Sequence, residues 1–142
     1  MSNFPELPSV TVLIPAYNEE ATISSVVQAC QDCPYVAEII VVDDGSSDST
    51  GDRAYNAGAR VLFLPENRGK AAALFFGAKA ANTPWLLLLD ADLIGLENKH
   101  VVSLITPVLN KTADSTLGLF TKGRFRTDLA HALTPFLSGQ RC

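Results

Sequence analysis

The chain has 142 residues, of which 47% are hydrophobic and 18% are charged, so it fits one globular domain with an apolar core and not a disordered segment. Its formal net charge of −4 provides no broad basic surface, so we do not expect a nucleic acid partner. The longest apolar run, residues 85–89, is far shorter than the roughly 20 residues that cross a bilayer. The first residues lack a secretory signal pattern, so we expect a cytoplasmic protein.

Short apolar runs alternate with stretches of helical periodicity from residue 10 to residue 89. This alternation is typical of βαβ units around a parallel sheet. Val, Ile and Leu fill successive positions of each run, as expected for strands that helices cover on both faces. The predicted strands are residues 10–14, 38–42, 60–64 and 85–89. The fold class that follows is α/β, with a Rossmann-like sheet between helices.

The first predicted helix lies between the first two strands. Residues 18–20, Asn-Glu-Glu, are expected to open it, because acidic residues stabilise the positive end of a helix dipole. One apolar stripe then follows at helical spacing, formed by Ile23, Val26, Val27 and Cys30. Cys30 and Cys33 are spaced like a redox or zinc pair, but no second pair accompanies them. We therefore interpret them as free thiols.

Three more helices are predicted farther along the chain. The second is short, with Asp48 or Ser49 as its N-cap and Gly58 just past its end. The third covers residues 70–81, where several alanines allow a close approach to the sheet, and the fourth covers residues 99–109 unless Pro107 shortens it. A strand at 116–120 and a helical pattern at 129–137 complete the prediction. No repeat or linker divides residues 1–142, so we expect a single domain.

Polar residues follow three of the four predicted strands directly. They occupy positions 15–19, 43–48 and 90–92. In open parallel sheets, ligands bind outside the carboxyl ends of the strands. We therefore expect these three clusters to converge on one edge of the sheet.

Asp90 and Asp92 follow the fourth strand and are separated by one residue. Carboxylate oxygens are hard ligands that suit Mg2+ or Mn2+, and such a metal bridging a diphosphate offsets the charge that grows on a leaving phosphate. The Asp-x-Asp pattern alone is equally consistent with a structural role, in which the two aspartates only cap a turn.

Asp43 and Asp44 end a second buried strand and strengthen the functional interpretation. Crowded carboxylates repel one another unless donors or cations separate them. The ring N–H and ribose hydroxyls of a nucleoside are such donors. The next residues, Ser46, Ser47 and Asp48, are equally consistent with simple turn and capping roles.

Lys70 follows Asn67, Arg68 and Gly69 at the predicted start of the third helix. Backbone N–H groups and an ammonium at a helix N-terminus favour a phosphate. The segment lacks the spacing of a P-loop, so a solvated surface lysine is the alternative.

Four motifs in order resemble the family 2 glycosyltransferases. The resemblance implies a Rossmann-like fold of the glycosyltransferase A type and a nucleotide-diphosphate-sugar donor linked to UDP or GDP. It covers about the first two thirds of the chain. The motifs are VLIPAYNEE at residues 12–20, IVVDDGSSD at residues 40–48, NRGK at residues 67–70 and DADL at residues 90–93.

The resemblance also implies a role for each candidate site residue. Asp44, alone or with Asp43, hydrogen-bonds the base, and Lys70 lies close to the nucleotide. Asp90 approaches the ribose and the metal, whereas Asp92 is the principal metal ligand. The base and ribose pocket is lined by Pro15, Tyr17 and Glu19.

Two subgroups of the family remain open. Residues 137–141 resemble a loop of polyprenyl-phosphate sugar transferases, which invert the anomeric centre. The spacing between NRGK and DADL resembles glucosyl-3-phosphoglycerate synthases, which retain it. The acceptor is accordingly expected to be a phosphorylated or polyprenyl-phosphate compound. Because the chain stops directly after that loop, we expect the acceptor part to be incomplete, and neither Asp114 nor Asp128 can be matched to a general base.

The main hypothesis is a metal-dependent hexosyltransferase. The alternative is a catalytically incomplete nucleotide-binding fragment or subunit that needs another chain or domain. A sugar-nucleotide pyrophosphorylase is disfavoured, because residues 15–19 lack its Gly-rich loop. A basic strip of Lys122, Arg124 and Arg126 suggests peripheral binding to an anionic membrane or an acceptor phosphate, although a solvent-facing loop is favoured. Homo-oligomer formation is left open.

Overall fold

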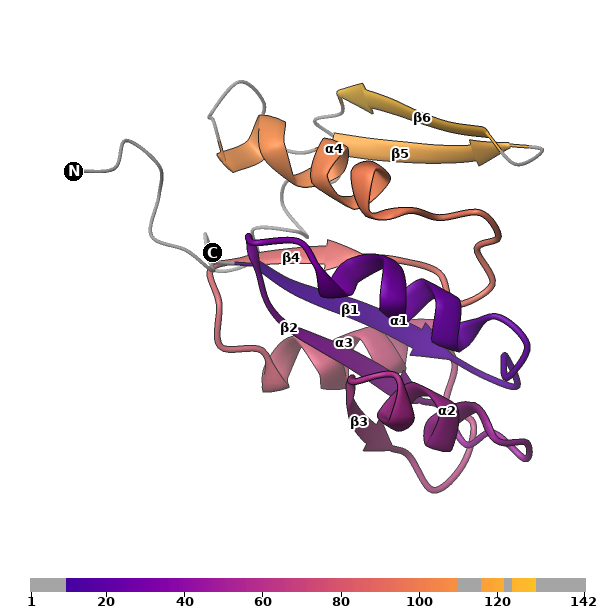
Figure 1. Cartoon of the computed structure of the whole chain (residues 1–142). Helices are drawn as coiled ribbons and strands as arrows, with labels where there is room; N and C mark the ends of the chain where they lie inside the picture. Colours follow the sequence, from indigo (N-terminus) through magenta and orange to yellow (C-terminus); the bar gives the residue numbers. More distant parts are fainter. Residues whose placement is uncertain (1–9, 110–115, 122–123, 130–142) are drawn as a thin grey trace.

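A computed structural model describes residues 10–109, 116–121 and 124–129 of the chain (Figure 1). Its elements alternate as the sequence predicts. They are, in order, β1 (Val10–Ala16), α1 (Ile23–Gln31), β2 (Val36–Asp43), α2 (Thr50–Asn56), β3 (Arg60–Phe63), α3 (Lys70–Ala80), β4 (Trp85–Leu88), α4 (Asn98–Leu109), β5 (Thr116–Thr121) and β6 (Arg124–Leu129).

The first four strands form one parallel sheet in the order β3-β2-β1-β4. In β1, one of the two inner strands, Leu13 pairs with Ile40 on one side and with Leu88 on the other. The chain extends the sheet from β1 through β2 to β3 and then returns past β1 to add β4. The strand order therefore reverses between β1 and β4, which is where open α/β sheets bind ligands. The predicted α/β fold is confirmed.

Helices cover both faces of this sheet, as predicted. Alternate residues of β1 point to opposite faces: Val12 packs in the core below α1 and α4, whereas Leu13 packs with Ala73 of α3. Figure 1 shows α1 in front of the sheet and α3 behind it. Burying one such side chain contributes about 1.5–3 kcal/mol, so the two cores hold the strand ends in fixed positions.

The approach of α3 to the sheet depends on a glycine as well as on the predicted alanines. A Cβ atom at Gly77 would lie 2.1 Å from Cδ1 of Leu13 and 3.0 Å from Cγ2 of Val42. Ala73, one turn earlier, is fully buried. Small side chains on this face therefore let the helix lie directly against β1 and β2.

The predicted start of the first helix is wrong. Thr22 is the N-cap of α1, and no acidic residue lies in its first turn. Asn18 has φ of 53° and belongs to the loop after β1. Its side chain and that of Glu20 bind a neighbouring loop and not the helix end. The dipole argument therefore does not apply to residues 18–20.

The other elements agree closely with expectation. Ser49 is the N-cap of α2, and Gly58, with φ of 108°, follows its end. Pro107 lies inside α4, which continues to Leu109. Arg124 and Arg126, expected in a solvent-facing loop, belong to β6, which pairs antiparallel with β5. Leu129, the first residue of the predicted helical pattern, is the last residue of this strand. The predictions for Asp114, Lys122 and residues 130–141 lie outside the described residues.

Cys30 and Cys33 are buried free thiols, which agrees with the interpretation from the sequence. Burial raises the pKa of Cys30 to about 12, and the nearby Cys33 adds to the effect. Within the described part of the chain, no helix has the length and apolar character to cross a membrane.

Candidate functional site

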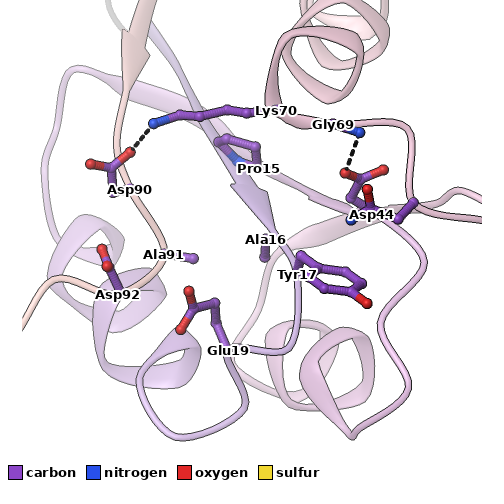
Figure 2. A pocket seen from close by; sticks show the side chains of 11 residues that line it. Pro15, Ala16, Tyr17, Glu19, Asp44, Gly69, Lys70, Asp90, Ala91 and Asp92 are labelled. Atoms are coloured by element: carbon purple, nitrogen blue, oxygen red, sulfur yellow. Dashed lines mark hydrogen bonds and ion pairs between the residues drawn. The ribbon is translucent and has the colours of Figure 1, made fainter.

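An open pocket of about 390 Å³ lies at the carboxyl ends of β1 and β4, where the strand order reverses (Figure 2). Seven of the eight site residues predicted from sequence line it, and Asp43 does not. The lining residues are Pro15, Ala16, Tyr17, Glu19, Asp44, Asn67, Gly69, Lys70, Asp90, Ala91 and Asp92. The expected convergence of the three strand-end clusters on one edge is thereby observed.

The loop after β1 carries Tyr17 and Glu19 into the pocket and is fixed by the loop after β2. The Asn18 side-chain oxygen accepts a hydrogen bond of 2.8 Å from the Ser47 backbone N–H, and the Asn18 N–H donates to Ser46 Oγ at 2.8 Å. An asparagine tolerates the left-handed backbone that this turn needs. The ring of Tyr17, next to it, is left 48% exposed at the pocket wall.

A second set of bonds joins the same two loops farther from β1. The Glu19 N–H donates to Thr50 Oγ1 at 2.8 Å, and a Glu20 carboxylate oxygen accepts the Ser49 N–H at 3.1 Å. Asp48, the residue before the N-cap Ser49, accepts the Thr50 N–H at 3.0 Å. In this structure, Ser46, Ser47 and Asp48 therefore make bonds within and between these two loops.

Asp44 connects the second strand to the segment before α3. Its buried carboxylate accepts the backbone N–H groups of Arg68 at 2.8 Å and Gly69 at 2.9 Å. Two backbone donors just before α3 are thus already paired with Asp44. At Gly45, where a Cβ would lie 2.6 Å from the Asn67 nitrogen, the two loops pack backbone against backbone.

Asp43 is placed differently from its neighbour. It is buried, and Oδ1 accepts the Ser46 N–H at 2.9 Å within its own turn. A Cβ at Gly51 would lie 2.6 Å from the other oxygen, so the start of α2 covers that side. Asp43 thus shapes the loop that carries Asp44, and its contact with a base stays a prediction.

Lys70 and Asp90 meet across the pocket. The Lys70 Nζ lies 2.5 Å from Oδ1 of Asp90, and both side chains are more than half exposed (Figure 2). Lys70 begins α3, whereas Asp90 follows β4. Lys70 therefore lines the pocket with a carboxylate as its partner, and its contact with a nucleotide stays a prediction.

Negative charge also gathers around Glu19. Burial raises the pKa of Glu19, and the negative charges of Asp92, Asp48 and Asp90 raise it further. In Figure 2, Glu19 stands between Tyr17 and Asp92. A bound cation here would relieve the repulsion among these carboxylates.

The donor set fits one kind of metal site and not another. Among the described residues, no group of three or more His, Cys, Asp or Glu side chains is arranged to hold a metal ion. Mg2+ and similar ions are commonly held by one or two carboxylates together with substrate phosphates. Asp90 and Asp92 therefore suit a metal that shares its ligands with a diphosphate, and not a metal held by protein alone.

Four further residues line the pocket that were not among the candidate site residues: Ala16, Asn67, Gly69 and Ala91. All four stand inside motifs that were recognised, VLIPAYNEE, NRGK and DADL. The available signal was their position inside these motifs near the strand ends, where ligands bind in open parallel sheets.

Comparisons with known proteins agree with this geometry. A family model described as Glycosyl transferase family 2 matches residues 11–135. Glucosyl-3-phosphoglycerate synthase of Mycobacterium tuberculosis is 36% identical over 110 residues, which are 71% of this chain and 34% of that protein. Poly-beta-1,6-N-acetyl-D-glucosamine synthase of Staphylococcus aureus is 40% identical over 97 residues, which are 65% of this chain and 24% of the relative. The chain therefore spans about a third or less of the length of these relatives.

Solved structures of one of these relatives are also similar to this chain. The mycobacterial synthase in complex with Mn2+, uridine diphosphate and glucosyl-3-phosphoglycerate has a TM-score of 0.66 and 36% identity, over 72% of this chain and 40% of that one. A crystal structure of the same synthase with Mg2+ and uridine diphosphate also has a TM-score of 0.66, at 36% identity, over 72% of this chain and 40% of that chain.

Proposed function

The chain belongs to glycosyl transferase family 2, and from this premise we propose that it transfers a hexose from a UDP- or GDP-linked sugar to a phosphate-bearing acceptor. The observation that carries the proposal is the convergence of Asp44, Asp90 and Asp92 with Lys70 around one pocket. We further propose that residues 1–142 act as one nucleotide-sugar-binding domain.

The base and ribose are assigned to the side of the pocket formed by Pro15, Tyr17, Glu19 and Asp44. Each Asp44 oxygen accepts only one backbone N–H. A carboxylate has about four acceptor positions, so Asp44 keeps capacity for a ring N–H of uracil or guanine. The exposed face of Tyr17 is available to pack against the nucleoside.

The diphosphate is assigned to the side formed by Lys70, Asp90 and Asp92. Asp92 is proposed as the principal ligand of Mg2+ or Mn2+, with Asp90 beside it. When bound, the metal supplies positive charge that stabilises the nucleoside diphosphate as it leaves the sugar. The surroundings of Glu19 support this assignment: burial is the main cause of its raised pKa, and the charges of Asp92, Asp48 and Asp90 add a part that a cation would offset.

A phosphate-bearing acceptor is favoured over other acceptors. Structures of the mycobacterial relative include one with UDP-glucose and phosphoglyceric acid, at 36% identity to this chain. A polyprenyl phosphate has the same phosphate chemistry and stays an alternative. Peripheral membrane binding, self-association and the cellular location stay predictions.

Thermal unfolding with UDP, GDP or CDP, each with Mn2+ or with EDTA, tests the donor assignment. A ligand of the native state raises the unfolding midpoint. We expect UDP or GDP to raise it in Mn2+ more than in EDTA, with CDP much weaker because its ring nitrogen accepts and does not donate. Equal midpoints under all conditions would refute the proposal.

Activity of the isolated chain is a separate question. Incubation with UDP-glucose or GDP-mannose, Mn2+ and 3-phosphoglycerate, followed by mass spectrometry of the products, distinguishes a complete enzyme from a nucleotide-binding part. A hexosyl phosphoglycerate product establishes transfer. Nucleotide binding without product, with 3-phosphoglycerate and with a polyprenyl phosphate in turn, supports the alternative, a part that needs another chain or domain.

A further inference from the structure

Thr22 uses its side chain in an unusual way for a residue that begins a helix. It is the N-cap of α1, where a threonine hydroxyl ordinarily accepts a backbone N–H of the first turn. Here the side chain makes no such bond. Its Oγ1 donates instead to the carbonyl oxygen of Ala91 at 2.7 Å, across 69 positions of sequence.

The acceptor lies at the centre of the proposed metal and diphosphate site. Ala91 is buried and separates Asp90 from Asp92. Its carbonyl belongs to the peptide that connects Ala91 to Asp92, and a peptide group is planar. A bond that fixes this oxygen therefore fixes the orientation of the backbone from which the Asp92 side chain departs.

The donor side of the bond is rigid. The Thr22 N–H donates to the Glu19 carbonyl at 3.2 Å, and the Thr22 carbonyl accepts from Val26 at 3.2 Å. Ile23, the next residue, is fully buried in the core. Thr22 thus transmits the position of α1 and of the Glu19 loop to the turn after β4.

We propose that Thr22 is a positioning residue for Asp92, one that sets the direction of the metal-binding carboxylate through the Ala91 carbonyl. The inference rests on the proposed function, because it assumes that Asp92 receives the metal. The proposal gives α1 an indirect role in metal binding, through the hydrogen bond from Thr22 to Ala91 and without a contact between α1 and the metal.

Three variants of the full chain test this role. Thr22→Val removes the donor and keeps the shape, and Thr22→Ser restores the hydroxyl. Ser25→Ala is the matched control. The Ser25 hydroxyl donates to the backbone carbonyl of Thr22 at the same end of α1, and it does not reach across to Ala91. The readout is the Mn2+ concentration that gives half of the maximal thermal stabilisation at a fixed UDP concentration, alongside the unfolding midpoint without ligand.

We expect Thr22→Val to raise the half-maximal Mn2+ concentration about tenfold, which is the lower end of effects seen when groups behind a metal ligand are removed. Thr22→Ser and Ser25→Ala should stay within about twofold of the wild type, taking that same effect size as the scale. If Thr22→Val proves too unstable to measure, Thr22→Ala provides the same loss of donor.

The two proposals fail in different ways. A wild-type chain whose stabilisation by UDP does not depend on Mn2+ overturns the proposed function and the role of Thr22 with it. The positioning role alone is overturned by a different result. In that result, the stabilisation of the wild type by UDP depends on Mn2+, and Thr22→Val lowers the unfolding midpoint without changing the half-maximal Mn2+ concentration.

Discussion

The Lys70 ammonium lies 2.5 Å from a carboxylate oxygen of Asp90. The first residue of α3 therefore offsets the negative charge of an aspartate that lies just after β4. Both side chains are more than half exposed, and exposed ion pairs contribute little to stability. The consequence of the pair is local, because it keeps a positive charge inside an acidic pocket in the absence of a ligand.

Replacing Lys70 should separate two kinds of binding. Lys70→Met should weaken UDP binding in Mn2+ about tenfold, the scale of a lost charge-assisted hydrogen bond. It should strengthen the binding of Mn2+ alone, because Asp90 no longer has an internal cation. Calorimetric titrations of both ligands measure the two effects. Lys79→Met is the control, since Lys79 lies on the same helix but packs over Phe75; equal effects of the two variants contradict the role of Lys70.

Asp44→Asn should loosen the segment before α3. An amide has one acceptor oxygen, so one of the Arg68 and Gly69 N–H groups would face an NH2 group. We expect a loss of about 1–3 kcal/mol in unfolding free energy and faster hydrogen exchange at these two amides. Asp32→Asn, at the exposed C-cap of α1, is the control. Unchanged exchange at residues 68 and 69 would show that Asp44 does not hold the segment.

Glu19 makes the ligand-free protein less stable at neutral pH. Its pKa in the folded state is raised above the ordinary value of 4.5, so folding favours the protonated form. The contribution of Glu19 to the free energy of unfolding is complete below pH 4.5 and is lost as the pH rises through the raised pKa. Glu19→Gln should therefore raise the unfolding midpoint at pH 7 and leave it unchanged near pH 4. Glu66→Gln is an exposed control. A midpoint difference that grows toward low pH has the wrong sign for this explanation.

Gly77→Ala should destabilise the protein although alanine favours helices. The added Cβ meets Leu13 at 2.1 Å in the core. Overpacking costs about 1–3 kcal/mol, against a gain of about 1 kcal/mol in helix propensity. Denaturant unfolding measures the net loss. Leu13→Val removes the contacting atom, so Gly77→Ala should cost less in that background. Additive effects of the two changes would place the clash elsewhere.

The sheet and the position of the pocket could be predicted from sequence, because they depend on local patterns. Runs of apolar residues identify buried strands, and the residues that follow such strands share one edge. Asp44, Lys70 and Asp90 were therefore expected at that edge without any contact information, and all three line the pocket there. Small residues on a helix face allow a close approach, so the alanines of α3 predicted its contact with the sheet, where Ala73 is buried.

The bonds between loops could not be predicted. Nothing local in the sequence indicates that Asn18 and Glu20 bind the β2–α2 loop, and this tertiary preference is the reason that α1 begins at Ile23. The pairing of Asp44 with two backbone N–H groups likewise joins segments 24 and 25 positions apart. Such bonds depend on the final packing of strands, which single-sequence patterns do not contain.

The central claim is that a metal at Asp92 joins the diphosphate to the protein. Calorimetric titration of UDP into the wild type and Asp92→Ala, each in Mn2+ and in EDTA, tests it most directly, with Glu97→Ala as a control carboxylate outside the pocket. The account predicts that Mn2+ strengthens UDP binding at least tenfold in the wild type and in Glu97→Ala, and that Asp92→Ala loses this gain. The same gain in Asp92→Ala would contradict the account.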